Sequence, residues 1–213
     1  MAELEVKNLR TASLEELGMD SERLADAFRA FQGRLGVVVG SKTTGENLSK
    51  SLWSGTLLKN NLEPEELELA LGLRARFDPC RQRLSEASKA LFPWVCQQFV
   101  PALTELEGKN LHTATLEELR SDSGRLVDAF ELFQGRLGVV VGSKSTGQNL
   151  SKILWSGTLL EKNFQREQLQ VAQNLRARFL TLKTEIANRR PIGSYGIDSG
   201  PAHRTDRGIR PKP

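Results

Sequence analysis

The sequence has few of the residues on which most catalytic and metal-binding sites depend. Its 213 residues include two cysteines, two histidines and one tyrosine. Cys80 and Cys96 are too few for a disulfide framework or a metal ligand set, and isolated cysteines are typical of proteins in a reducing compartment. His112 and His203 belong to no arrangement of nucleophile, base and acid. We therefore expect no catalytic residues, no metal and no cofactor, and a protein that is not an enzyme.

Long apolar runs are also absent. The N-terminal residues MAELEVKNLR contain no apolar signal segment, and apolar residues make up 38% of the chain. No run approaches the roughly 18 apolar residues that a membrane-spanning helix needs. The sequence therefore predicts a cytoplasmic protein without a membrane partner, and a basic C-terminal end would also suit a nuclear one.

The formal net charge of +4 is concentrated at that C-terminal end. Residues 188–213 contain six Arg or Lys and two Asp, so the preceding residues are neutral as a whole. Residues 189–213 are also rich in Gly, Pro and Ser and show no apolar periodicity, which predicts a disordered basic tail. A neutral folded body attracts polyanions only through local patches.

An internal repeat is the main feature that the sequence does contain. Residues 7–77 align without a gap with residues 109–179, at an offset of 102, and 50 of the 71 positions are identical. Such a pattern indicates a tandem duplication of one structural unit. The predicted boundaries are 1–77 for repeat unit 1, 78–108 for a helical connector, 109–188 for repeat unit 2 and 189–213 for the tail.

Capping signals and apolar spacing predict that both units are helical, which gives an all-α fold. Ser13-Leu-Glu-Glu16 has the form of a capping box, and Thr115-Leu-Glu-Glu118 repeats it. A second helix is expected to open at Asp20 or Ser21, with apolar residues at spacings of three and four up to Leu35. Two similar units are expected to pack about an approximate two-fold axis.

The connector is too apolar for a flexible linker. Its apolar residues between Leu84 and Leu103 predict helix, interrupted at Pro93 and Pro101. Because an apolar connector is stable only when its apolar face is buried, we expect it to pack against the units and to hold them as one rigid body.

A glycine-rich string offers three interpretations. Residues 36–43 and their copy at 138–145 nearly match the phosphate-binding loop G-x-x-x-x-G-K-[ST], but Ser41 and Ser143 replace its second glycine. No neighbouring strands are predicted that would form the required parallel sheet. A surface loop between helices is therefore favoured over a simple anion contact, and both are favoured over a nucleotide-hydrolysing site.

Charge is segregated onto the least varied part of the repeat. Residues 32–59 and residues 134–162 each carry a net charge of +3 within a body that is neutral. Two basic patches on a rigid body would suit contacts with a phosphate backbone, and each patch includes a tryptophan that would either stack on a base or pack in the core. The candidate nucleic-acid-binding residues are Arg34, Lys42, Lys50, Trp53, Arg136, Lys144, Lys152 and Trp155.

Two functional hypotheses follow. The first is a non-catalytic, sequence-tolerant RNA-binding protein that reads duplex shape and phosphates, as a viral accessory protein that sequesters RNA would. The alternative is a helical module that binds a partner protein or a second copy of itself and has no affinity for nucleic acid.

Overall fold

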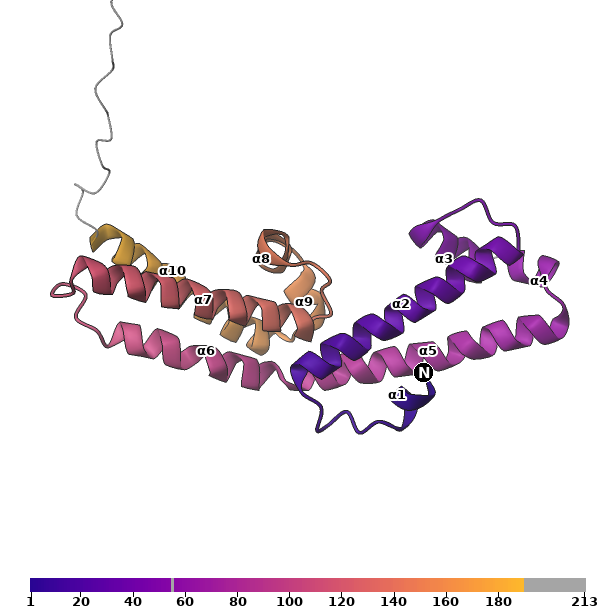
Figure 1. Ribbon diagram of the computed structural model, residues 1–213, viewed down its shortest axis with the longest axis horizontal. Coiled ribbons are helices and arrows are strands. Elements are labelled where there is room, and N and C mark those ends of the chain that lie inside the picture. Colours follow the sequence, from indigo (N-terminus) through magenta and orange to yellow (C-terminus); the bar gives the residue numbers. More distant parts are fainter. Residues whose placement is uncertain (55, 190–213) are drawn as a thin grey trace, which may run out of the picture.

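The computed structural model describes residues 1–54 and 56–189, and all regular structure within these ranges is α-helical. This confirms the helical fold class there, whereas the predicted tail from residue 190 onward lies outside the described residues. Figure 1 shows the arrangement of the helices. Their bounds are α1 Ala2–Val6, α2 Leu14–Val38, α3 Gly45–Ser54, α4 Leu57–Asn61, α5 Pro64–Ala90, α6 Phe92–Glu107, α7 Leu116–Val140, α8 Gly147–Ser156, α9 Leu159–Asn163 and α10 Arg166–Arg189.

Helix α2 begins at the predicted capping box. The Ser13 hydroxyl accepts a hydrogen bond from the Glu16 N–H, and the Glu16 carboxylate accepts one from the Ser13 N–H. The helix then runs without a break through Asp20, so the second start expected there does not occur. The Asp20 carboxylate is not needed as a cap and instead accepts a 2.6 Å hydrogen bond from Lys7 Nζ. Thr115 and Glu118 cap α7 in the same way.

Helices α7, α8 and α9 have the bounds of α2, α3 and α4 shifted by 102 residues. In both sets the short helix lies close against the long one because a glycine stands at the contact. A Cβ at Gly36 would lie 2.9 Å from Leu48 Cδ1, and a Cβ at Gly138 would lie 2.9 Å from Leu150 Cδ1. Glycine is therefore retained inside these helices for close packing, despite a cost of about 1 kcal/mol relative to alanine.

The connector is divided between two helices. Helix α5 continues past residue 77 to Ala90, and α6 begins at Phe92 with Pro93 in its first turn. The interruption expected at Pro101 does not occur, because α6 continues through it to Glu107. Burial of Phe99 and Leu103 on either side of the proline stabilises the helix against the loss of one backbone hydrogen bond.

The helices form two bundles: α1–α5 make the first bundle, and α6–α10 make the second. Helix α6 is the third long helix of the second bundle. It packs against α7 and α10, and Figure 1 shows the three helices side by side. The buried residues of this bundle form one continuous cluster, whereas the corresponding part of the first bundle contains two separate clusters. One cluster surrounds Phe77 and includes the contact with α1, and the other surrounds Leu52 of α3. The repeated sequence is thus packed differently in its two occurrences.

The two bundles contact each other head to tail. The C-terminal end of α7 lies on the N-terminal half of α2, where a Cβ at Gly18 would lie 3.2 Å from Val139 Cγ1. Lys144 Nζ also lies 3.7 Å from Asp26 Oδ1. A two-fold arrangement would bury Val37, the counterpart of Val139, in a reciprocal contact, but Val37 is 79% exposed. The expected two-fold packing is therefore not formed.

Candidate functional site

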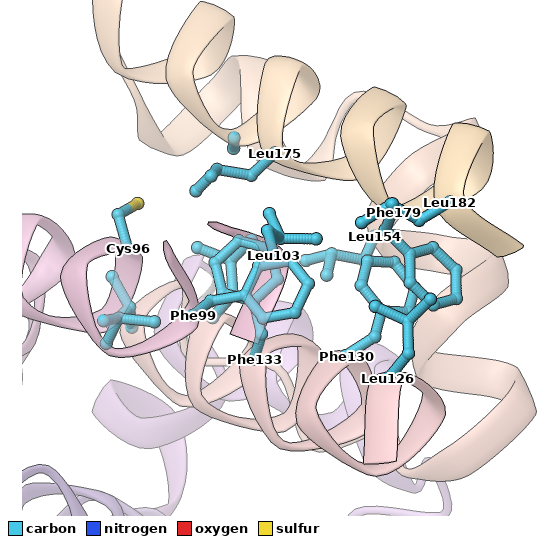
Figure 2. Packing of buried hydrophobic residues seen from close by; sticks show 14 of the residues in the cluster. Cys96, Phe99, Leu103, Leu126, Phe130, Phe133, Leu154, Leu175, Phe179 and Leu182 are labelled. Atoms are coloured by element: carbon cyan, nitrogen blue, oxygen red, sulfur yellow. The ribbon is translucent and has the colours of Figure 1, made fainter. Parts of the chain in front are cut away.

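Aromatic contacts hold α6 in a groove between α7 and α10. The Phe99 ring stacks on Phe133 with centroids 4.8 Å apart, and Phe92 lies 4.5 Å from Phe164. Figure 2 shows Phe99 and Leu103 of α6 lying among Phe133 of α7 and Leu175 of α10. Since every one of these side chains is buried, α6 completes the core of this bundle.

Charged contacts fix the C-terminal end of α6. The Arg178 guanidinium donates to both carboxylate oxygens of Glu107, at 2.7 and 2.6 Å, and Arg125 donates to Glu105 at 2.7 Å. The hydrogen bond from Arg178 lowers the pKa of Glu107 from its ordinary value. Bidentate pairing of this kind specifies the register of a helix as well as contributing energy.

In the first bundle, only the last turn of α6 has an equivalent among the described residues. Helix α1 corresponds to the last turn of α6, since Glu3-Leu4-Glu5 matches Glu105-Leu106-Glu107. Arg76 donates to both carboxylate oxygens of Glu5 at 2.7 Å, as Arg178 does to Glu107, and this lowers the pKa of Glu5. Leu4 packs against the cluster around Phe77. Among the described residues, no helix follows the rest of the α6 path in the first bundle.

An apolar surface of α2 and α5 is therefore left without a covering helix among the described residues. Four residues that are buried in the second bundle are partly or largely exposed in the first: Val38 is 68% exposed and its counterpart Val140 is 1% exposed. Phe31, Leu35 and Leu73 are half-buried, whereas their counterparts are at most 4% exposed. We call Phe31, Leu35, Val38 and Leu73 the open groove. Because each residue type is unchanged between the bundles, the difference comes from what packs on each residue. Phe99 of α6 stacks on Phe133, whereas Val140 lines the cleft between the bundles.

The sequence-predicted cations differ in their surroundings. Arg136 lies over the Trp94 ring at 4.9 Å, and Lys144 lies near Asp26. Four others are exposed, and no ion pair is formed by them within residues 1–54 and 56–189: Arg34, Lys42, Lys50 and Lys152. Of the three candidate cations in the second repeat, Arg136 contacts Trp94 and Lys144 lies near Asp26. Lys152 is the candidate there for which the structure shows no such contact among the described residues.

Both predicted tryptophans lie in aromatic clusters. Trp53 stacks on Phe28 with centroids 6.1 Å apart, and the Arg74 guanidinium lies 5.0 Å from its ring centroid. Trp155 has the same environment, with Phe130 at 6.1 Å. Each indole Nε1 is buried and, within the described part of the chain, lacks a hydrogen-bond partner. These positions show the rings contributing to packing between the helices.

The glycine-rich string forms the end of α2 and the loop that follows it. Residues 36–38 are helical, so the string does not follow a strand as a phosphate-binding loop would. Gly40 and Gly45 adopt φ values of 66° and 61°, which favour glycine and let the chain turn into α3. The loop borders a cleft of about 1100 Å³ between the bundles, which Ser143 and Lys144 also line. The other candidate cations do not line it.

Other kinds of site have little support. Among the described residues no group of three or more His, Cys, Asp or Glu is placed to hold a metal ion. None of the described helices combines the length and apolarity needed to cross a membrane. Burial raises the pKa of the Cys96 thiol to about 11, which keeps it protonated and poorly nucleophilic.

Within the described residues, these features define a helical protein with an uncovered apolar surface in one of its two bundles. Comparison with family models, curated proteins and solved structures finds no match to this chain. The groove was missed in the sequence because Phe31 and Leu35 lie on an ordinary amphipathic stripe. The difference becomes apparent only when the exposure of matching residues in the two bundles is compared.

Proposed function

We propose that this chain is a non-catalytic protein-interaction module that binds a partner through the open groove, and that its two bundles arose by tandem duplication. The observation that carries the proposal is the contrast between Phe31, which is half-buried, and its counterpart Phe133, which is 2% exposed where Phe99 of α6 stacks on it. Contiguous exposed apolar residues are uncommon on soluble proteins and often mark a binding surface.

Energetics support the same function. Full burial of a leucine, valine or phenylalanine side chain contributes about 1.5–3 kcal/mol. In the second bundle, this burial free energy comes from residues that α6 covers. In the first bundle, the matching residues stay partly in contact with water. A partner that covers the open groove would gain what α6 contributes in the second bundle.

The test measures whether the open groove is accessible to an apolar ligand. An environment-sensitive apolar dye should bind the full chain, and Leu35→Asp or Val38→Asp should abolish that binding. Val6→Asp is the matched control, because Val6 is 86% exposed but lies outside the groove. Absence of dye binding, or equal loss in all three variants, would reject the proposed function.

Sequence-tolerant RNA binding is the second candidate. The observation that favours it is the exposure of Arg34, Lys42, Lys50 and Lys152, which form no ion pair among the described residues. Phosphate contacts predict a gel shift with duplex RNA at low salt that weakens as salt rises, and that Lys42→Glu with Lys152→Glu further weakens. A chain that does not shift duplex RNA at low salt contradicts this candidate.

A further inference from the structure

We infer that the partner bound by the open groove is an amphipathic helix that reproduces the contact face of α6. This inference rests on the proposed function and specifies the chemistry of its ligand. The helix presents large apolar residues in the pattern of Phe92, Val95, Phe99 and Leu103, that is, at intervals of three and four residues. Recognition of an amphipathic helix in an apolar groove is a common mode of peptide binding.

The residues of the open groove are the same in type as their counterparts in the second bundle. Phe31 corresponds to Phe133, on which Phe99 of α6 stacks. The helices that carry them also begin at matching residues. A surface of the same composition on the same helices fits the same ligand, and that ligand is a helix.

Cationic side chains along the open groove also match those that contact α6 in the second bundle. In the second bundle Arg136 lies over the ring of Trp94, and Arg125 pairs with Glu105. Their counterparts in the first bundle are Arg34, which is exposed, and Arg23, whose side chain is 76% exposed. Glu3 of α1 already stands at the position of Glu105, so the partner helix is expected to carry an aromatic residue opposite Arg34.

The length of the partner helix follows from α1. Because Glu5 pairs with Arg76 as Glu107 pairs with Arg178, the last turn of the α6 path is already filled in the first bundle. The uncovered part corresponds to residues 92–103 of α6. At 1.5 Å per residue, the partner helix covers about 18 Å of groove, or roughly three turns.

A second copy of this chain is a poorer occupant. Its α6 would have to leave its own groove, so that one apolar surface would be covered only by exposing another. Arg120 occupies the position in α7 that corresponds to Gly18, so a second copy would meet an arginine where Val139 packs on Gly18 within the chain. A Cβ at Gly18 would lie 3.2 Å from Val139, and an arginine side chain is far larger. The partner is therefore a different protein with an α6-like helix.

The α6 sequence itself supplies the probe. A fluorescently labelled peptide of residues 90–104, with Cys96→Ser to prevent oxidation, is titrated with the full chain and followed by fluorescence anisotropy. We expect saturable binding of one peptide per chain. Leu35→Asp in the protein, or Phe99→Asp in the peptide, should weaken binding at least about tenfold, and Arg34→Glu should weaken it by about threefold or more. Val6→Asp should leave it unchanged.

Further measurements keep the outcomes distinct. Circular dichroism verifies that Leu35→Asp remains folded, and Val38→Asp serves as a second variant because Val38 is already largely exposed. Dye binding without peptide binding overturns this inference and leaves the proposed function standing, whereas loss of both overturns both. Peptide binding that is insensitive to Leu35→Asp and Val38→Asp, or a wild-type dimer that Leu35→Asp dissociates, also overturns the inference.

Discussion

Alanine substitution of two equivalent leucines should have unequal effects on stability. Leu137 is 0% exposed beneath α6, whereas Leu35 is half-buried in the open groove. Truncation of a fully buried leucine removes its transfer free energy and leaves a cavity, which together cost about 2–5 kcal/mol. Truncation at Leu35 removes only part of the transfer term, and water can enter the space, so its cost is about 1 kcal/mol. The expected difference is therefore about 2 kcal/mol.

The assay is urea unfolding of wild type, Leu35→Ala and Leu137→Ala. Circular dichroism follows helix content, and tryptophan fluorescence follows the aromatic clusters of both bundles. Because two bundles can unfold in separate transitions, each transition is fitted by itself. Equal losses of stability at the two positions, or a larger loss at Leu35, would refute the conclusion that α6 covers one bundle and leaves the other open.

Three further changes test the contacts that hold the second bundle together. Lys109→Met should lower the free energy of unfolding in urea by about 2 kcal/mol, because the Asp122 carboxylate, 3% exposed, then loses its partner at 2.8 Å. An unchanged free energy of unfolding would contradict this. Arg178 holds the pKa of Glu107 below its ordinary value of 4.5, so this pair stabilises the fold above about pH 4.5 and its contribution is lost as the pH falls through the lowered pKa. Glu107→Gln should therefore lower stability at neutral pH but not in acid, and an equal effect at both would contradict the assignment. The Cys96 thiol, with a pKa of about 11, should react slowly with a thiol reagent at about pH 8 until denaturant separates α6 from the bundle; rapid labelling of the native protein would show that α6 is not packed as described.

The local structure followed from the sequence where a single short-range signal decided it. The capping box at Ser13 and Glu16 fixed the start of α2, and its copy at Thr115 and Glu118 fixed the start of α7. Asp20 was misleading, because a helix-capping residue inside an established helix has no unpaired N–H groups to satisfy. It pairs with Lys7 instead, and the helix continues.

The candidate site could not be predicted in the same way, because it depends on packing between distant segments. Phe31 and Phe133 occur in the same local sequence, and only the position of α6 makes one half-buried and the other buried. The interruption expected at Pro101 concealed the role of α6 as a continuous helix of the second bundle. Arg34 was singled out for its charge, whereas the structure shows in Arg136 that this position contacts an aromatic ring on a neighbouring helix.

Hydroxyl-radical footprinting of the native protein tests the central claim most directly. Oxidation measured by mass spectrometry at Phe31 and Leu35 is compared with oxidation at Phe133 and Leu137 in the same sample, so that sequence context is matched and burial alone differs. We predict that Phe31 and Leu35 are oxidised readily and that their counterparts are protected until the protein unfolds. Equal protection of both pairs would show that the groove in the first bundle is closed, and would contradict the account.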